Sequence, residues 1–137
     1  MKRLLSFQRI QGFTLTELLV VLIIIGILVL LALPSLMPLI ARAKSTEAKL
    51  QLTHLHMLQK NNFYIYSKYT SDMGELGFEQ QPLTTEDGSA NYLIEIVEAD
   101  AAGFLARATS VVDFDGDGVF NVWEVDEKKK LVEVTKD

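Results

Sequence analysis

The sequence predicts an α+β protein in which one long N-terminal helix packs on a small antiparallel sheet. Residues 18–41 form an uninterrupted run of 24 uncharged and mostly apolar side chains. Residues 42–66 then place apolar side chains three or four positions apart, which is the spacing of an amphipathic helix. The remaining chain contains four short segments of strand-like alternation, separated by turn-forming residues.

Length and composition exclude several classes of protein. With 137 residues, the chain has room for one small domain beyond the apolar run, which excludes a large enzyme and a polytopic membrane protein. The net charge of −5 includes +3 from the first twelve residues, so residues 13–137 carry −8. This acidic body argues against nucleic acid as a direct partner, because phosphate binding depends on Lys and Arg. Cysteine is absent, no catalytic constellation is recognisable, and we expect no enzymatic activity.

The apolar run is long enough to cross a membrane. At about 1.5 Å of rise per residue it would span roughly 36 Å, compared with about 30 Å for the hydrocarbon core of a bilayer. One interpretation is a secretory signal peptide cleaved at the Ala-x-Ala sequence of residues 41–43, although the run is about twice the usual length. A second interpretation is a simple anchor whose basic end stays in the cytoplasm.

The residues that border the apolar run favour a third interpretation. They read Gly12-Phe13-Thr-Leu-Thr-Glu17. This border resembles the class III signal of type IV pilins and type II secretion pseudopilins, in which a short basic leader precedes Gly-Phe-Thr-Leu-x-Glu and a hydrophobic helix. The resemblance implies that residues 1–12 are a leader, that prepilin peptidase cleaves between Gly12 and Phe13, and that the new amine of Phe13 is N-methylated. A separate resemblance lies in residues 63–78, where an aromatic helix end precedes Tyr-Thr and Leu-Gly-Phe.

Glu17 is an acid at the edge of the apolar run and therefore needs a partner. A carboxylate costs about 2.5–3.5 kcal/mol at the centre of a bilayer, and the next basic residue toward the C-terminus is Arg42. The resemblance implies that the Phe13 amine of a neighbouring subunit pairs with Glu17 and sets the register of assembly. The alternative is a carboxylate that only reaches out to the membrane interface.

Residues 13–66 are expected to form one helix of roughly 80 Å with two halves. Residues 13–41 would be the transmembrane and assembly half, and residues 42–66 the amphipathic half. Pro34 and Pro38 each remove a backbone donor, so we expect a helix break within residues 26–38, as kinking or as local melting.

Residues 67–137 are expected to form a globular head with an αβ-loop and an antiparallel sheet. The amphipathic half would cover this sheet with a stripe formed by Ala48, Leu52, Leu55 and Leu58. His54 and His56 are two positions apart, so they diverge on a helix and are expected at the surface or rim. Strands are predicted at residues 91–98, 104–112, 121–126 and 131–135, with Trp123 in core or sheet packing.

Residues 113–124 match the twelve-residue calcium loop and predict one structural calcium ion. Carboxylate and carbonyl oxygens suit a hard dication, and Gly118 stands where the loop turns sharply. Because this loop is predicted between strands and not helices, its last residue would be able to point away from the ion. The alternative is an Asp/Gly-rich hairpin turn without a cation. The predicted ligands are Asp113, Asp115, Asp117, the carbonyl of Val119, Asn121 and Glu124.

Together these features predict a structural subunit of a type IV pilus or pseudopilus that polymerises through its N-terminal helix. The resemblance implies as partners copies of the chain, related pilins or pseudopilins, a prepilin peptidase and methyltransferase, and an inner-membrane assembly platform. It also implies a bacterial inner-membrane location with the head in the periplasm, followed by a periplasmic pseudopilus or a surface pilus. The alternative is a membrane-anchored periplasmic module that binds calcium or another ligand and does not polymerise.

Overall fold

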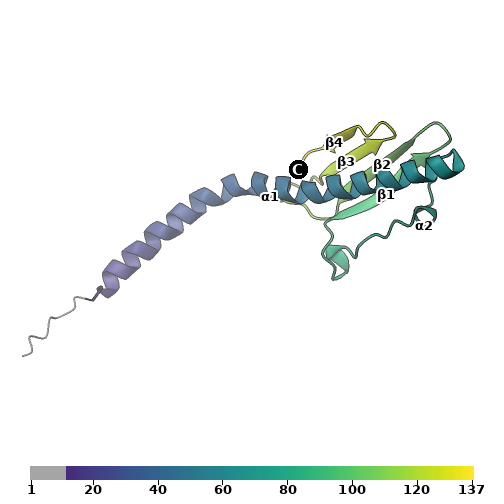
Figure 1. Ribbon diagram of the computed structural model, residues 1–137. Helices are drawn as coiled ribbons and strands as arrows, with labels where there is room; N and C mark the ends of the chain where they lie inside the picture. Colours follow the sequence, from purple (N-terminus) through teal and green to yellow (C-terminus); the bar gives the residue numbers. More distant parts are fainter. Residues whose placement is uncertain (1–11) are drawn as a thin grey trace, which may run out of the picture. The chain divides into compact units, whose positions relative to one another are not determined.

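The computed structural model describes residues 12–137, in which one long helix precedes a four-stranded sheet (Figure 1). Residues 12–36 form one unit, and Met37–Asp137 form a second. Apart from Gly12, the predicted leader lies outside the described residues. The elements in chain order are α1 (Leu15–Tyr66), α2 (Met73–Leu76), a 3₁₀ turn η1 (Thr84–Glu86), β1 (Tyr92–Ala99), β2 (Phe104–Ser110), β3 (Val122–Asp126) and β4 (Leu131–Thr135).

Helix α1 is uninterrupted, including at its two prolines. The local melting expected at Pro34 and Pro38 is therefore wrong for this structure of the single chain. Each proline removes only one backbone donor, and the residues on either side keep helical hydrogen bonds of their own. The hydroxyl of Ser35 also donates to the carbonyl of Ala32 at 2.7 Å, which adds one bond in the affected turn.

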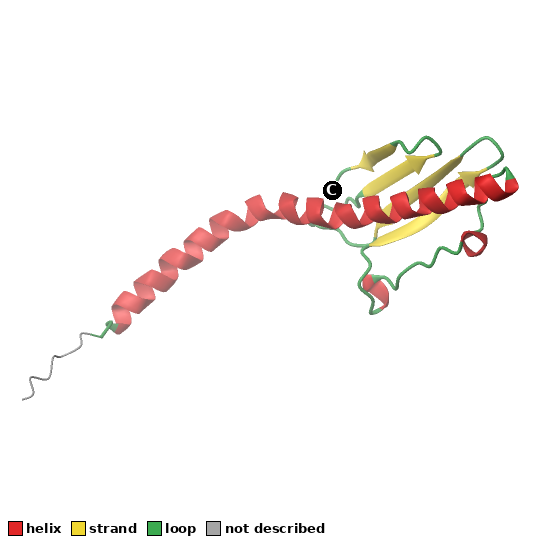
Figure 2. Cartoon of the chain, viewed as in Figure 1, coloured by secondary structure: helices red, strands yellow, loops and turns green. Residues whose placement is uncertain are grey.

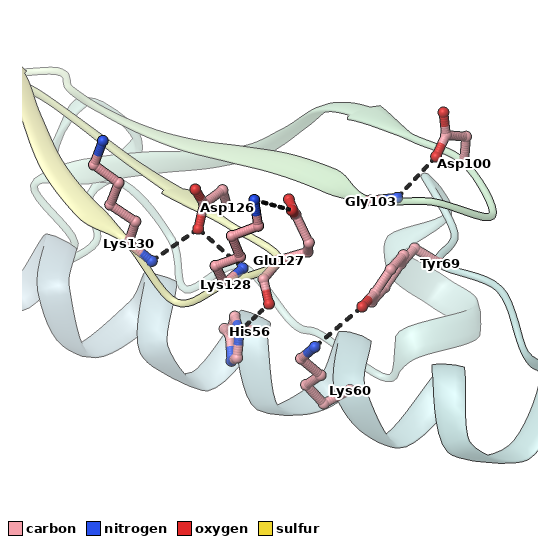
Figure 3. A network of polar contacts seen from close by, with 9 residues as sticks. All are labelled: His56, Lys60, Tyr69, Asp100, Gly103, Asp126, Glu127, Lys128 and Lys130. Atoms are coloured by element: carbon pink, nitrogen blue, oxygen red, sulfur yellow. Dashed lines mark hydrogen bonds and ion pairs between the residues drawn. The ribbon is translucent and has the colours of Figure 1, made fainter.

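The four strands form an antiparallel meander in the order β1-β2-β3-β4 (Figure 2). An aspartate closes each of two connections, because its short side chain accepts hydrogen bonds from nearby backbone N–H groups. Asp100 accepts from Gly103 at 2.8 Å between β1 and β2. Asp126 accepts from Lys130 at 2.8 Å between β3 and β4, and both turns are visible in Figure 3. The predicted strands are confirmed to within two residues at each end.

The second unit has its core between α1 and the sheet. Ala48, Leu52 and Leu55 are fully buried, which confirms the predicted stripe, and Leu58 packs against its edge. Burying one leucine side chain stabilises a fold by about 1.5–3 kcal/mol. The small side chains on β2 leave room for the helix to lie close to the sheet. The strands contribute Tyr92, Ile94, Phe104, Ala106, Ala108 and Val125 to this core.

Two buried amide side chains of α1 hold the segment that follows the helix. Gln59 is fully buried, and its side chain donates to the carbonyl of Thr70 at 2.6 Å and accepts from the N–H of Thr70 at 3.1 Å. Asn62 donates to the carbonyl of Lys68 at 3.0 Å. These bonds fold the chain back along the end of the helix, toward the short helix α2. Its first turn is capped by the carboxylate of Asp72.

His56 lies inside the head, so the expectation of a surface or rim position is wrong for this residue. Only 6% of His56 is exposed, and its Nε2 lies 3.2 Å from the carbonyl oxygen of Glu127 (Figure 3). Its ring also packs 5.7 Å from the ring of Phe104, centroid to centroid. The buried face of α1 is wider than the predicted four-residue stripe, because it extends over His56 and Gln59. His54 is exposed, as expected.

Candidate functional site

The residues of the predicted cleavage site are accessible. Gly12 is exposed, and Phe13 is 85% exposed just before α1 begins at Leu15. A Cβ atom at Gly12 would meet no heavy atom within 4 Å among the described residues. Among residues 12–137, nothing covers the peptide bond between Gly12 and Phe13.

Glu17 and Thr14 form a reciprocal cap at the start of α1. The N–H of Glu17 donates to the hydroxyl of Thr14 at 3.2 Å, and the N–H of Thr14 donates to the carboxylate of Glu17 at 3.5 Å. This is a capping box, which satisfies two backbone donors that the first turn otherwise leaves unpaired. Glu17 also lies where the helix macrodipole favours a negative charge. The sequence analysis missed this local role, although the Thr-x-x-Glu spacing before an apolar run signals it.

The first unit presents a continuous apolar surface. Its large apolar side chains, from Phe13 to Leu36, are each between 44% and 85% exposed. By length and composition α1 qualifies as a membrane span. One 18-residue window of this helix has a mean hydropathy of 3.1, and none of its residues is buried inside the protein. A surface of this kind marks contact with a membrane or with other proteins. Glu17 is the one charged side chain in this part of the described chain.

A second candidate site is a cluster of four carboxylates in the head. One oxygen from each of four aspartates lies within 4.8 Å of the others, and three of these residues belong to the predicted calcium loop. Two glycines with left-handed backbone, at φ of +82° and +87°, shape the loop between them. The four residues are Asp113, Asp115, Asp117 and Asp137.

The loop carboxylates also accept backbone hydrogen bonds within the loop. Asp113 accepts from Gly116 at 2.6 Å and from Gly118 at 2.7 Å. The N–H of Gly118 is the main reason that the pKa of Asp113 lies below its usual value. Asp115 and Asp117 each use one oxygen as an acceptor for a backbone N–H. Those two residues therefore each keep a second carboxylate oxygen for another ligand.

Asp115 experiences the negative charge of the cluster. The N–H of Asp117 lowers the pKa of Asp115, but desolvation and the charges of Asp117, Asp137 and Asp113 outweigh it, so the pKa is raised above its usual value. A nearby cation would relieve this repulsion. The arrangement is thus chemically suited to a hard cation with oxygen ligands.

Two of the predicted calcium ligands point elsewhere. Glu124 pairs with Arg107, with 2.6 Å between Oε1 and Nη2, because β3 places it directly opposite Arg107 on β2. Asn121 is buried and accepts a hydrogen bond from the Tyr92 hydroxyl at 2.8 Å. Both predicted ligand roles are wrong for this structure, because a strand follows this loop where the sequence pattern assumes a helix. Val119 stays in the loop, where its N–H donates to Asp117 at 2.7 Å.

Asp137 joins the three loop aspartates in place of Asn121 and Glu124, the ligands predicted from the sequence pattern. It lies 20 positions beyond Asp117, yet one of its oxygens accepts from the N–H of Phe114 at 2.9 Å. Its other oxygen is buried and has no hydrogen-bond partner among residues 12–137. Asp137 lies outside the twelve-residue calcium motif. Its position in the cluster therefore follows from the tertiary structure and could not be read from the spacing of the motif.

Comparison with known proteins bears on the N-terminal segment most directly. Residues 8–33 match the family described as the prokaryotic N-terminal methylation motif. A curated relative, the type IV major pilin protein PilA of Myxococcus xanthus (strain DK1622), is 43% identical over 70 residues. Over this stretch the chain is similar to a type IV pilin. The matched part covers 51% of this chain and 32% of the relative. The chain therefore aligns with about a third of that protein.

These findings confirm the resemblance that the border of the apolar run predicted. The structure confirms the predicted α+β architecture as well, because the second half of α1 packs on an antiparallel sheet. The methylation motif includes both residues of the predicted cleavage site and Glu17.

Proposed function

We propose that the chain is a structural subunit of a type IV pilus or pseudopilus that polymerises through its N-terminal helix. The observation that carries this proposal is the exposed apolar surface of the first unit, most of which lies within the methylation motif of residues 8–33. Once the helix leaves the membrane, this surface would otherwise meet water, at a cost of about 1.5–3 kcal/mol for each leucine or isoleucine, so packing against equivalent helices stabilises the filament. The similarity to a type IV major pilin supports the same conclusion.

Processing would create the assembly-competent chain. In this proposal a prepilin peptidase cleaves the exposed bond between Gly12 and Phe13, and the same class of enzyme methylates the new amine. Before assembly the helix holds the subunit in the bacterial inner membrane, with the head in the periplasm. An inner-membrane platform then adds subunits to a surface pilus or a periplasmic pseudopilus.

Glu17 would change partners during assembly. In the single chain its carboxylate accepts the N–H of Thr14 at 3.5 Å, which is a long hydrogen bond. The methylated amine of Phe13 on a neighbouring subunit is a charged donor, and charge-assisted hydrogen bonds are about twice as strong as neutral ones. Exchange of one partner for the other would fix the axial register of the filament.

Two substitutions at Glu17 separate its charge from its capping role. Glu17→Gln keeps a side-chain acceptor for the capping box but removes the negative charge, whereas Glu17→Ala removes both. We expect both variants to be inserted and processed like the wild type, and both to form no filaments in electron micrographs. Glu79→Ala, which alters an exposed head acid, is the control and should assemble normally. Normal filaments of Glu17→Gln would refute charge pairing and leave only the helix cap.

The same experiment tests the alternative of an anchored module that does not polymerise. That alternative predicts no filaments from the wild-type chain and no difference among the three variants. It also predicts an uncleaved N-terminus.

The second proposal is a structural calcium ion in the head, bound by the four-aspartate cluster. Its support is the convergence of four carboxylates and the raised pKa of Asp115. We expect millimolar calcium to raise the melting temperature of the head, and a chelator to reverse this. Asp115→Asn should remove the response, while the control Glu79→Gln should keep it. A melting temperature that does not depend on calcium in the wild-type chain would refute the site.

A further inference from the structure

A lysine, a glutamate and an asparagine meet where the amphipathic half of α1 passes the start of the sheet. Lys44 and Glu47 are three positions apart, so they lie on the same face of the helix. Asn91 directly precedes β1. The Nζ atom of Lys44 lies 3.2 Å from the Oδ1 atom of Asn91, and an oxygen of Glu47 lies 2.7 Å from its Nδ2 atom. An amine and a carboxylate therefore hold the two ends of one side-chain amide.

The amide of Asn91 is fixed in position between the helix and the sheet. Only 6% of Asn91 is exposed, and its neighbours Ala90 and Tyr92 are buried as well. Glu47 contacts the asparagine with both oxygens, since the second one accepts from the backbone N–H of Asn91 at 2.7 Å. Burial, and then the charge of Glu47, raise the pKa of the Tyr92 hydroxyl above its usual value. Little water therefore screens the carboxylate of Glu47 on this side.

These three groups can carry out an exchange between an amine and an amide. A lysine amine in its neutral form is a nucleophile, and the Cγ carbon of an asparagine is an electrophile whose leaving group is ammonia. The Cγ carbon of Asn91 is one C=O bond, about 1.23 Å, from the oxygen that Lys44 contacts. Rotation within the long lysine side chain therefore brings Nζ to the distance of about 3–3.5 Å from which attack occurs.

We propose that Lys44 and Asn91 form an intramolecular isopeptide bond. The Nζ–Cγ bond forms and the Cγ–Nδ2 bond breaks. Once Nζ has added to Cγ, both nitrogens are attached to the same carbon, and the carboxylate of Glu47 already contacts one of them. Glu47 takes a proton from Nζ and delivers it to Nδ2. Overall, a lysine ammonium and an asparagine amide become one secondary amide and one ammonium ion, without an oxidant or a cofactor.

The bond would join α1 to the first strand and close a loop of residues 44–91. A covalent closure restricts the unfolded chain as a disulfide does, and this chain has no cysteine. It would also keep the helix attached to the sheet when a pulling force acts on α1. The inference does not depend on polymerisation, because all three residues belong to the unit Met37–Asp137.

Intact mass and peptide mapping of the full chain in detergent test the bond. Loss of ammonia lowers the mass by about 17 Da below that calculated for the same polypeptide. Trypsin does not cleave after a lysine in amide linkage, so we expect a branched peptide that joins residues 43–49 to residues 69–107. Lys44→Arg keeps the positive charge and should retain its full mass.

Lys60→Arg is the matched control and should lose ammonia like the wild type. Lys60 is half-buried on the same helix, but it donates to the hydroxyl of Tyr69 and contacts no amide. Lys44→Arg should also melt about 10 °C or more below the wild type, because it lacks the closed loop. Lys60→Arg should stay closer to the wild type.

Glu47→Gln tests the proton transfer. Glutamine keeps an acceptor for Asn91 but does not exchange protons as a carboxylate does, so the fraction of linked chains shortly after synthesis should fall about tenfold or more. An equal linked fraction would overturn the role of Glu47. A wild-type chain with its full mass would overturn the bond itself. So would a loss of about 17 Da without the branched peptide, since a cyclic imide at Asn91 has the same mass.

Discussion

Gln59 gives the sharpest prediction about what holds the head together. Its amide is fully buried and bonds both backbone groups of Thr70, at 2.6 Å and 3.1 Å. Gln59→Ala removes both bonds. Each contributes about 0.5–1.5 kcal/mol, so the substitution should cost about 2 kcal/mol in the free energy of unfolding. Because 1 kcal/mol corresponds to about 4–8 °C for a domain of 60–100 residues, the melting temperature should fall by roughly 8–16 °C.

The assay is thermal unfolding of the full chain in detergent, followed by the fluorescence of Trp123 in the head. Gln51→Ala is the matched control, since Gln51 lies on the same helix, is half-buried and makes no side-chain hydrogen bond within the described part of the chain. It should shift the melting temperature by no more than a few degrees. Equal melting temperatures for the two variants would show that the bonds to Thr70 do not hold the loop, and would refute the reasoning.

The remaining predictions concern the turns and the acidic loop. Hydrogen bonds from backbone N–H groups lower the pKa of Asp100 in the folded chain. Its ionised form therefore stabilises the fold above the unfolded pKa of about 4, and this contribution is lost as the pH falls. Asp100→Asn should lower the melting temperature at pH 7 but not near pH 2. Gly88→Ala would press a methyl group onto the carbonyl of Pro82, so limited proteolysis should cut this loop faster in the variant than in the wild type. Equilibrium dialysis should find unchanged calcium binding in Glu124→Gln and weakened binding in Asp117→Asn; the opposite order would restore the ligand set predicted from sequence alone.

The elements of the fold were predictable because their signals are local. An apolar run specifies α1, and period-two alternation between Asp- and Gly-containing turns specifies the strands, whatever the rest of the chain does. Local melting at Pro34 and Pro38 was predicted wrongly, because a missing donor weakens a helix without necessarily ending it. His56 and Gln59 were overlooked as core residues, since a polar side chain reveals no buried partner until the opposing segment is placed.

The candidate metal site could be predicted from the sequence only in part. Asp113, Asp115 and Asp117 are close in sequence, so any compact loop brings them together. Glu124 was assigned from a pattern that assumes a helix after the loop, but β3 turns it toward Arg107. Asp137 joins the cluster only through tertiary structure.

The N-terminus of the mature chain tests the central claim most directly. An intact mass combined with N-terminal peptide sequencing would be measured on protein isolated from its native membrane. Assembly through the Phe13 amine and Glu17 predicts a chain that begins at N-methylated Phe13. A chain that begins at Lys44, or one that retains residues 1–12, would contradict the account.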